Sequence, residues 1–511
     1  MTILNYLQRC LNLKKIPLLS LVLCTNLNAL NYQHQTAVYM EQIKDSPKLL
    51  SEFIQAMPKG GDLHNHLSGA SYAENLLRYA KDEKFCFSYE NMSVSKDVNC
   101  HSQNFLDEVI KDSQQRDKII DAWSMRNFSP NSSENSDQHF FATFSKFGAI
   151  SSAHKPEMLA EVVARAGENN ELYMEIMLRA DSNLAKEIGQ KVVWENDFDA
   201  MWQKLHEAGI DQAVIKINEN LEKFTQEKDR LLQCKIYPKE GCDVTVRYIH
   251  EVLRDYEPAQ VFSQMLASFK AAATNPNIAG VNLVQAENGS FAFRDYDLHM
   301  DMMAYFHKRY PKVHFSLHAG ELTHQIVPQE NLESHIRKAI EVGHAERIGH
   351  GVDILDEADA DELLSSMANK HIPVEINLSS NDYILHLSGV AHPFHTYLTA
   401  NVPLTLSTDD EGVNRSNITG EYTKAVQEQQ LNYQQLKTIS RNSLQYAFLP
   451  GTSLFEHYDY NQIATACKGD EPGSLNPSKT CKEFLDANQK AALQWQLEQR
   501  FNHFESNWSK R

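Results

Sequence analysis

Eight short apolar runs, each followed by a stretch that could form a helix, predict a (β/α)8 barrel. The ends of several runs carry histidines or carboxylates, as expected where barrel strands end in an active site. The runs cover residues 61–67, 173–178, 244–252, 278–285, 313–320, 347–352, 373–379 and 403–408. We therefore predict an α/β TIM barrel with an N-terminal helical extension and inserted loop and helical segments.

The length and composition fit this class. The chain has 511 residues, enough for one large barrel with additions or for two or three ordinary domains. Apolar residues make up 42% and charged residues 23%, which is typical of a soluble globular protein with an ample core. The formal charge of −18 argues against a nucleic-acid backbone or an anionic membrane surface as partner.

The N-terminus has the features of a targeting segment. Arg9, Lys14 and Lys15 precede an apolar run at residues 16–24, and residues 27–29 offer a small residue for cleavage. The run is too short to span a bilayer, so we expect no integral membrane segment. We predict that residues 1–29 are a cleaved signal peptide and that the protein is secreted or periplasmic. Lipidation of Cys24 is the alternative, but residues 21–23 lack the small residue expected before such a cysteine.

Six further cysteines form three pairs that are close in the sequence. An even number of paired cysteines in an exported chain predicts disulfide bonds, with buried free thiols as the alternative. Proximity suggests the pairs Cys86–Cys100, Cys234–Cys242 and Cys467–Cys481.

The remaining chain divides by composition into three parts. We expect a helical extension at residues 30–56, a barrel at 57–455 and a helical tail at 456–511. Polar or charged stretches at about 82–138 and 194–242 are predicted insertions into the barrel. The N-terminal helices are a candidate homodimer interface, with packing on their own barrel as the alternative.

The strand ends together predict a metal site. His64 and His66 share one face of the first strand, and His318 and Asp409 end the fifth and eighth. Three histidines and one carboxylate suit a single Zn²⁺ ion per chain, which activates water near neutral pH.

Three neighbouring side chains complete the predicted chemistry. Glu321 is placed to carry a proton, His350 to orient water, and Asp410 to face the substrate. Each motif alone has a structural explanation, such as a chance histidine pair, a buried histidine or a helix cap at the Asp409–Asp410 pair. Convergence of four strand ends on the same chemistry favours the functional interpretation.

Four motifs resemble a known family. MPKGGDLHNHLSGA, SLHAGE, RIGHG and LSTDDEGV are similar to the signatures of the adenosine deaminase family, in this order, over roughly residues 57–449. Export and the cysteine-containing insertion make the chain most like the secreted branch, the adenosine deaminase-related growth factors. The resemblance implies a zinc-dependent barrel enzyme that converts adenosine or 2′-deoxyadenosine to the inosine product and ammonia.

The resemblance also implies residue roles. His64, His66, His318 and Asp409 resemble the zinc ligands. Glu321 resembles the residue that protonates purine N1, His350 the residue that holds the attacking oxygen, and Asp410 the residue that contacts this oxygen and purine N7.

Two positions depart from the family pattern at expected substrate contacts. Ser68 replaces an aspartate that reaches the ribose 5′-hydroxyl, and Gln285 replaces a glycine that approaches the purine. Ser68, Gln285 and the nearby Glu287 are therefore candidate substrate-binding residues, with loop structure as the alternative for Glu287.

Other functions stay open at the level of sequence. The alternatives are deamination of adenine, a modified nucleoside or a nucleotide, and a nucleoside-binding or signalling protein without turnover. A nucleotide needs a basic phosphate site, for which the candidates near strand ends are Lys59, Arg347 and Arg415. A pure binding protein has no need of Glu321 together with His350.

Overall fold

The computed structural model describes residues 18–96, 100–129 and 135–511, with side chains from residue 31 onward. Most of the expected signal peptide, including Cys10 and the side chain of Cys24, lies outside the described part. The chain forms two compact units. One comprises Met1–Gly60 with Leu431–Arg511, and the other comprises Gly61–Gln430.

The second unit is the predicted barrel. Its eight strands follow one another in the sheet in chain order, and the strand pairs that are described are parallel. The strands are β1 (Gly60–His66), β4 (Glu171–Leu178), β5 (Thr245–Leu253), β6 (Ile278–Val284), β7 (His314–Ala319), β8 (Arg347–His350), β9 (Val374–Ile376) and β10 (Leu404–Leu406). The ring is completed where the His66 amide donates to the Asp409 carbonyl at 2.9 Å and the Asp409 amide to the His64 carbonyl at 2.8 Å. The (β/α)8 prediction is confirmed.

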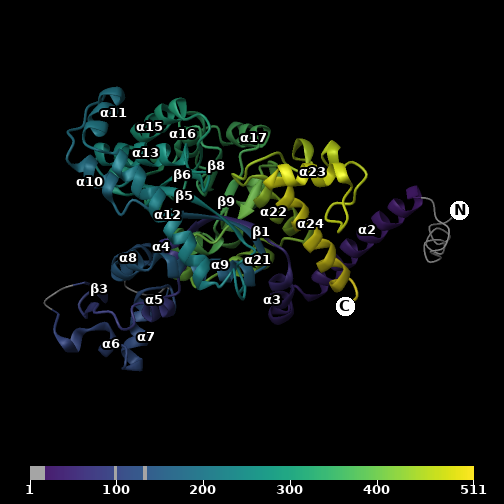
Figure 1. Ribbon diagram of the computed structural model, residues 1–511, viewed down its shortest axis with the longest axis horizontal. Coiled ribbons are helices and arrows are strands. Elements are labelled where there is room, and N and C mark those ends of the chain that lie inside the picture. The colour runs from purple at the N-terminus through teal and green to yellow at the C-terminus, as the bar shows by residue number, and fades with distance from the viewer. Residues whose placement is uncertain (1–17, 97–99, 130–134) are drawn as a thin grey trace. The chain divides into compact units, whose positions relative to one another are not determined.

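Helices follow the strands and cover them on the outside (Figure 1). Local sequence explains their starts: Pro258 opens α13 where no backbone donor is needed, and Asn417 caps α21 by accepting from the Gly420 amide. These helices are α9 (Lys155–Glu168), α10 (Leu184–Gln190), α13 (Pro258–Ala272), α14 (Ser290–Arg294), α15 (Tyr296–Arg309), α16 (His335–Glu341), α17 (Ala360–Lys370), α18 (Leu378–Leu385), α19 (Phe394–Thr399), α20 (Glu411–Asn414) and α21 (Ile418–Gln429). Short 3₁₀ turns lie at η2 (Gln329–Asn331) and η3 (Gly389–Ala391).

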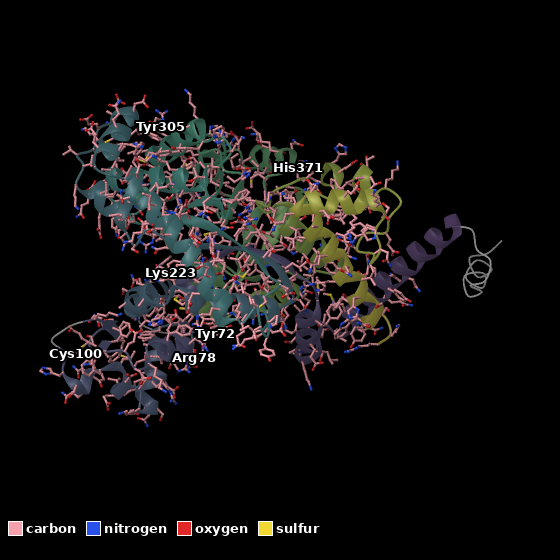
Figure 2. All side chains as sticks on the ribbon, viewed as in Figure 1. Tyr72, Arg78, Cys100, Lys223, Tyr305 and His371 are labelled. Atoms are coloured by element: carbon pink, nitrogen blue, oxygen red, sulfur yellow. A yellow bond between two sulfur atoms is a disulfide. The ribbon has the colours of Figure 1, made fainter. Side chains whose placement is uncertain are left out.

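Both expected insertions are present as folded segments. The first follows α4 (Leu67–Ala70) and α5 (Ala73–Tyr79), and its outer end carries Cys100 (Figure 2). It contains the antiparallel pair β2 (Cys86–Ser88) and β3 (Ser93–Ser95), then η1 (Ser102–Asn104), α6 (Leu106–Val109) and α7 (Ser113–Ala122), and leads into α8 (Ser136–Ala153). The second insertion consists of α11 (Phe198–Glu207) and α12 (Asp211–Leu231).

The first unit joins the two ends of the chain. The helical extension expected at residues 30–56 contains two helices, α2 (Leu18–Ile43) and α3 (Pro47–Ala56), because Pro47 starts a new helix. The C-terminal part contains α22 (Tyr433–Gln445), η4 (Glu456–Tyr458), η5 (Thr465–Cys467), α23 (Lys479–Ala487) and α24 (Gln489–Trp508). Residues 431–455 were expected to belong to the barrel. They belong to this first unit instead, because α22 packs on α24.

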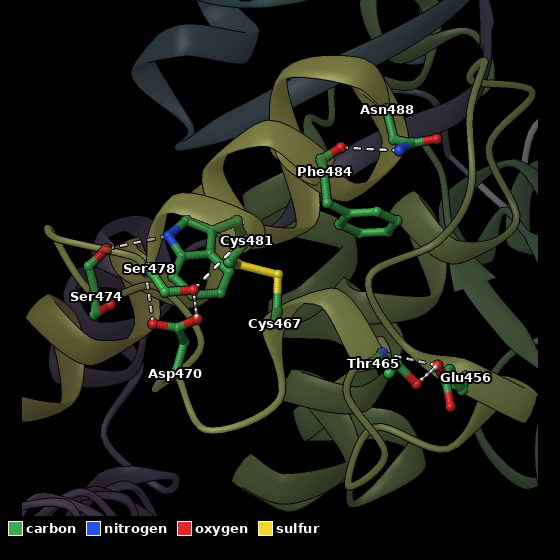
Figure 3. Close-up of a disulfide and its surroundings, with 10 residues drawn as sticks. Glu456, Thr465, Cys467, Asp470, Ser474, Ser478, Cys481, Phe484 and Asn488 are labelled. Carbon is green, nitrogen blue, oxygen red and sulfur yellow. Dashed lines mark hydrogen bonds between the residues drawn. A yellow bond between two sulfur atoms is a disulfide. The ribbon is translucent and has the colours of Figure 1, made fainter.

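All three predicted disulfides are formed. The sulfur–sulfur distances are 2.18 Å for Cys86–Cys100, 2.08 Å for Cys234–Cys242 and 2.01 Å for Cys467–Cys481. The third joins Cys467 of η5 to Cys481 of α23 (Figure 3). It lies within an apolar cluster that includes Leu454 and Trp495. Within the described part of the chain, no helix has the length and apolar character needed to cross a membrane.

Candidate metal centre and active site

Three imidazoles and one carboxylate meet at the C-terminal ends of β1, β7 and β10. One ligand atom from each of His64, His66, His318 and Asp409 lies within 4.8 Å of the others, and all four residues are buried. His66 Nε2 is 3.2 Å from His318 Nε2, and Asp409 Oδ1 is 3.5 Å from His64 Nε2 and 3.4 Å from His66 Nε2. The structure therefore brings together the four residues expected as metal ligands.

The outer nitrogen of each ring is held by an oxygen acceptor. These contacts are His64 Nδ1 to Glu375 Oε2 at 2.7 Å, His66 Nδ1 to Glu251 Oε1 at 2.9 Å, and His318 Nδ1 to Asn282 Oδ1 at 2.9 Å. An acceptor at Nδ1 places the proton there and leaves the Nε2 lone pair free to bind a cation. The three Nε2 atoms consequently face one another and Asp409.

The charges around His64 attract a cation. Burial disfavours positive charge on this ring, but hydrogen bonds to Asp409 and Glu375 raise the pKa of His64 to about 10. Glu375 is itself fixed by Ser316 Oγ at 2.9 Å and Arg347 Nε at 2.6 Å. Although burial opposes its charge, Arg347 and His64 lower the pKa of Glu375 to about 2. Imidazole nitrogens and a carboxylate oxygen in this setting fit a divalent transition metal.

Left-handed backbone conformations orient the side chains of Asp409 and His350. Asp409 and His350 have φ angles of +55° and +69°, in the left-handed region that residues with side chains rarely adopt. Ser380 Oγ donates to Asp409 Oδ2, so Oδ1 is left to face the histidines. The strained turns thus direct both side chains toward the centre of the barrel.

Glu321 lies beside the four candidate metal ligands, on a turn that Glu287 holds. Its Oε1 has no hydrogen-bond partner within the described chain and is 3.4 Å from His350 Nδ1. Burial, followed by the charge of Asp409, raises the pKa of Glu321 well above its usual value. A buried carboxyl group that keeps its proton at neutral pH can act as a general acid.

Glu287 holds the backbone of this turn. Its oxygens accept from the Gly320 amide at 3.2 Å and the Glu321 amide at 2.9 Å, and His335 Nδ1 lies 2.6 Å from Oε1. Glu287 was a candidate substrate contact, but it is 1% exposed and lies beneath the turn rather than in the cavity wall. Its oxygens are already occupied by the turn, so it positions Glu321.

A chain of hydrogen bonds fixes the ring of His350. Asn381 Nδ2 donates to His350 Nδ1 at 2.9 Å, and Asn381 Oδ1 accepts from His392 Nε2 at 3.1 Å. Burial lowers the pKa of His350 to about 3, so the ring is neutral. With Nδ1 accepting, Nε2 carries the proton and is available as a donor.

Asp410 directly follows Asp409, one of the four candidate metal ligands, and lines the cavity. Burial, reinforced by the charge of Asp409, raises the pKa of Asp410 well above its usual range. Its Oδ1 has no partner within the described residues. A Cβ atom on Gly69 would lie 2.0 Å from this oxygen, so only glycine leaves room for the Asp410 carboxyl group.

A cavity of about 520 Å³ extends from these residues. Ser68 and Gln285 line it, as expected, together with an aromatic wall from α8 formed by Phe140, Phe141, Phe144 and Phe147. Metal-facing polar groups at one end and aromatic rings along a side are suited to a flat heterocycle.

Comparison with known proteins agrees with this geometry. The sequence profile of the family described as adenosine deaminase matches residues 131–456, more than half of the chain. The chain belongs to the adenosine deaminase family. The growth-factor branch expected from the sequence is not resolved by this match.

Individual relatives are more distant. The adenosine deaminase of Mycobacterium leprae is 28% identical over 223 residues, which span 41% of this chain and 56% of that protein. An adenosine deaminase of Escherichia coli O1:K1 / APEC is 34% identical over 137 residues, 27% of this chain and 38% of that protein. The chain thus spans only about half the length of the curated relatives it matches, or less.

A solved structure supports the barrel fold. The zinc-bound amidohydrolase from Burkhoderia ambifaria has a TM-score of 0.51 and 14% identity, over 90% of this chain and 95% of that one. Membership of the adenosine deaminase family makes the chain a hydrolase of a metal-dependent family, and the buried histidine–aspartate cluster is where a metal fits.

The backbone of Gln285 adopts a conformation that favours glycine. The φ angle of Gln285 is +87°, a conformation that glycine adopts at little cost. The Gln285 side chain accepts from the Asp255 amide at 3.0 Å, so this chain keeps the turn and adds a polar wall residue.

The basic residues near the cavity differ from those expected. Lys59 donates to the Ile54 and Met57 carbonyls, Arg347 pairs with Glu175 and Glu375, and Arg415 pairs with Glu74. The lining residues include none of these three, but they do include Arg179 and Lys186, which sequence reasoning missed. Arg179 directly follows strand β4 in the sequence, and this position at a strand end could have identified it.

Proposed function

We propose that the protein is a zinc-dependent hydrolase that converts adenosine or 2′-deoxyadenosine to inosine or 2′-deoxyinosine and ammonia. The observation that supports this most directly is the convergence of three Nε2 atoms and Asp409 Oδ1 beside Glu321, a buried carboxyl group whose pKa is raised. Zinc accepts this ligand set, and when bound it makes an activated water available at neutral pH.

The chain's own side chains supply the remaining steps. Glu321 donates its proton to purine N1, which makes the C6 carbon more electrophilic. His350 holds the attacking water through its Nε2 proton, since its Nδ1 is occupied by Asn381. Asp410, kept protonated by burial, can donate to purine N7 and so orient the ring.

The surroundings of the site favour turnover over passive binding. A binding protein gains nothing from burying an unpaired carboxyl group, which destabilises the fold by about 1–3 kcal/mol. Ser68 and Gln285 line the cavity, which supports their proposed role as contacts for the sugar or the purine.

We also propose that the protein acts outside the cytoplasm, after removal of residues 1–29. The three disulfides support this, because such bonds persist in oxidising compartments. Homodimerisation through α2 and α3 stays a prediction. Within its own unit, α2 packs along α24, with Thr36 Oγ1 3.4 Å from the Glu505 carbonyl.

The test is an assay of purified protein of known zinc content with adenosine, 2′-deoxyadenosine, adenine and AMP, following the change in purine absorbance. Glu321→Gln should lower kcat by about 10²- to 10⁴-fold, the range for lost proton transfer. Glu330→Gln, an exposed site on η2, is the matched control. Turnover of adenine alone would move the substrate assignment, and zinc-loaded protein that turns over none of the four would contradict the proposal.

A further inference from the structure

The neighbours of His350 decide which of its two ring nitrogens carries the proton. Asn381 Nδ2 is 2.9 Å from His350 Nδ1. Asn377 Nδ2 is 3.5 Å from both ring nitrogens, so this contact favours neither of them. Glu321 Oε1 is 3.4 Å from Nδ1, beyond the usual length of a side-chain hydrogen bond. The amide of Asn381 is therefore the group that sets the tautomer of His350.

An asparagine amide can face the ring in two ways, with opposite results. With Nδ2 toward His350, the ring accepts at Nδ1 and keeps its proton on Nε2. With Oδ1 toward His350, the ring has to donate from Nδ1, and Nε2 has no proton. Both orientations have nearly the same shape, so the contact between Asn381 and His350 cannot select one by itself. The other end of the amide has to select it.

The other end of the Asn381 amide contacts a second buried histidine, His392. His392 Nε2 is 3.1 Å from Asn381 Oδ1, and His392 is 3% exposed. Burial, with the charge of Lys424, lowers the pKa of His392 to about 3, so the ring is neutral and has one proton. Within the described residues, His392 Nδ1 has no hydrogen-bond partner.

This missing partner decides the direction of both hydrogen bonds. A proton on His392 Nδ1 would be a buried donor without an acceptor, which is costly. The proton therefore belongs on Nε2, where Asn381 Oδ1 accepts it. The amide is then turned with Nδ2 toward His350, as the structure has it. The position of the proton on His392 thus fixes the position of the proton on His350.

The segment that carries His392 is anchored to the end of α21. Gln429 Nε2 donates to the Gly389 carbonyl at 2.7 Å, and the Gln429 carbonyl is 2.9 Å from His395 Nε2. Between these two contacts, Val390 is 98% exposed, whereas His392 is buried. The segment therefore turns inward from the surface after η3, and its anchors hold His392 against α18.

We propose that His392 is a positioning residue for the active site: through the Asn381 amide it keeps the proton of His350 on Nε2, where it can hold the attacking water. The effect on rate rests on the proposed deamination, because that reaction assigns the water to this N–H group. The position of the proton is independent of turnover and can be measured separately.

The first experiment locates the proton. Neutron diffraction from deuterium-exchanged crystals of the purified protein with added zinc distinguishes an amide nitrogen from its oxygen and shows which ring nitrogen carries deuterium. We expect deuterium on Nε2 of both His350 and His392, with Asn381 Nδ2 toward His350. Deuterium on His350 Nδ1, or Asn381 Oδ1 toward His350, would overturn the inference whether or not the protein is active.

Two variants at position 392 separate the hydrogen bond from packing. His392→Leu removes the donor, so the Asn381 amide can turn, and kcat should fall about five- to tenfold with a smaller change in KM. His392→Gln keeps an N–H donor for Asn381 Oδ1 and should retain most of kcat. The matched control is His386→Asn, at an exposed left-handed position before the same segment, which should match the wild type. Wild-type kcat in folded His392→Leu, or equal losses in both variants, would reject the inference.

Asn381→Asp reverses the contact with His350. A carboxylate of the same shape can only accept, so the proton should move to His350 Nδ1 and kcat should fall at least about 10²-fold. Neutron diffraction that still shows His350 protonated only on Nε2 in this variant would prove that position 381 does not set the tautomer. If the wild type deaminates none of the purines, the proposed function fails, and diffraction from the wild type still decides the role of His392.

Discussion

Buried carboxylates differ in their hydrogen-bond and ion-pair partners between the barrel and the unit formed by the two chain ends. In that unit, Lys437 Nζ lies 2.6 Å from Glu505 Oε1, and Arg441 contacts both oxygens of Glu498 at 2.7 Å. Each of these buried carboxylates therefore has a cation as its direct partner.

The barrel pairs some buried carboxylates with cations, such as Glu375 with Arg347, but leaves other buried carboxyl groups without partners. Glu321 Oε1, Asp410 Oδ1 and both oxygens of Asp353 are buried and have no hydrogen-bond partner within the described chain. Each such group destabilises the fold by about 1–3 kcal/mol. The barrel therefore keeps buried carboxyl groups that are available for the proposed proton transfer, whereas the terminal unit neutralises the two described here with cations.

The largest expected effect tests the terminal unit. Cys467→Ala with Cys481→Ala opens a loop of 14 residues, which should lower the free energy of unfolding by about 3 kcal/mol. Denaturant titration measures this loss. Because the pair lies outside the catalytic groups, kcat/KM per folded molecule should not change.

The bond Cys234–Cys242 is the matched control for this pair. It closes a loop of 8 residues, so its removal should cost about 0.5 kcal/mol less. A large loss of kcat/KM in the variant that lacks Cys467 and Cys481 would show that the terminal unit contributes to catalysis as well as to stability.

An intermediate effect is expected at Glu287. Glu287→Gln places an amide donor against one of the two backbone donors of Gly320 and Glu321, so the turn loses one acceptor. We expect kcat to fall by about 30-fold, equivalent to about 2 kcal/mol in the barrier, with a smaller change in KM.

Steady-state kinetics on the folded fraction separates this effect from misfolding. Glu287→Asp keeps both acceptor oxygens and should recover part of kcat, while Glu330→Gln, exposed on η2, should change nothing. Wild-type kcat in folded Glu287→Gln would show that this turn does not control Glu321.

The smallest effect concerns Asp353 and pH. Burial, with the charges of Glu287 and Glu357, raises the pKa of Asp353 well above its usual value. The folded state therefore keeps this proton after the unfolded state has lost it, so the group's contribution to stability falls as pH rises above the ordinary aspartate pKa of about 4.

The substitution Asp353→Asn should remove this loss, because an asparagine side chain is neutral at every pH. We expect the variant to match the wild type near pH 4 and to exceed it by about 1 kcal/mol near pH 8. Denaturant titrations at both values measure the difference. A variant that is less stable at pH 8 would show that the Asp353 charge has a partner.

The sequence was sufficient to predict the strands and the four residues that meet at the candidate metal centre, because both are local signals. His64 and His66 alternate on one strand, and SLHAGE places His318 and Glu321 around a single strand end. The three disulfide pairs were also local, with separations of 8 to 14 residues.

Contacts between distant strands were not predictable in the same way. Glu375 holds His64 across 311 positions of sequence, and Glu251 holds His66 across 185. The available signal was a glutamate inside an otherwise apolar strand, which is costly unless it is paired. Arg179 and Lys186 were not among the basic residues expected near strand ends, and Lys186 reaches the cavity from helix α10 rather than from a strand end.

We propose that His64, His66, His318 and Asp409 hold one zinc ion beside Glu321. The most direct measurement is diffraction from crystals of the purified protein at the zinc absorption edge, which locates the metal without relying on activity. We expect one zinc ion per chain, about 2.0–2.2 Å from the three Nε2 atoms and Asp409 Oδ1. A zinc ion bound by other residues, or a fully active protein with no metal at these four atoms, would contradict it.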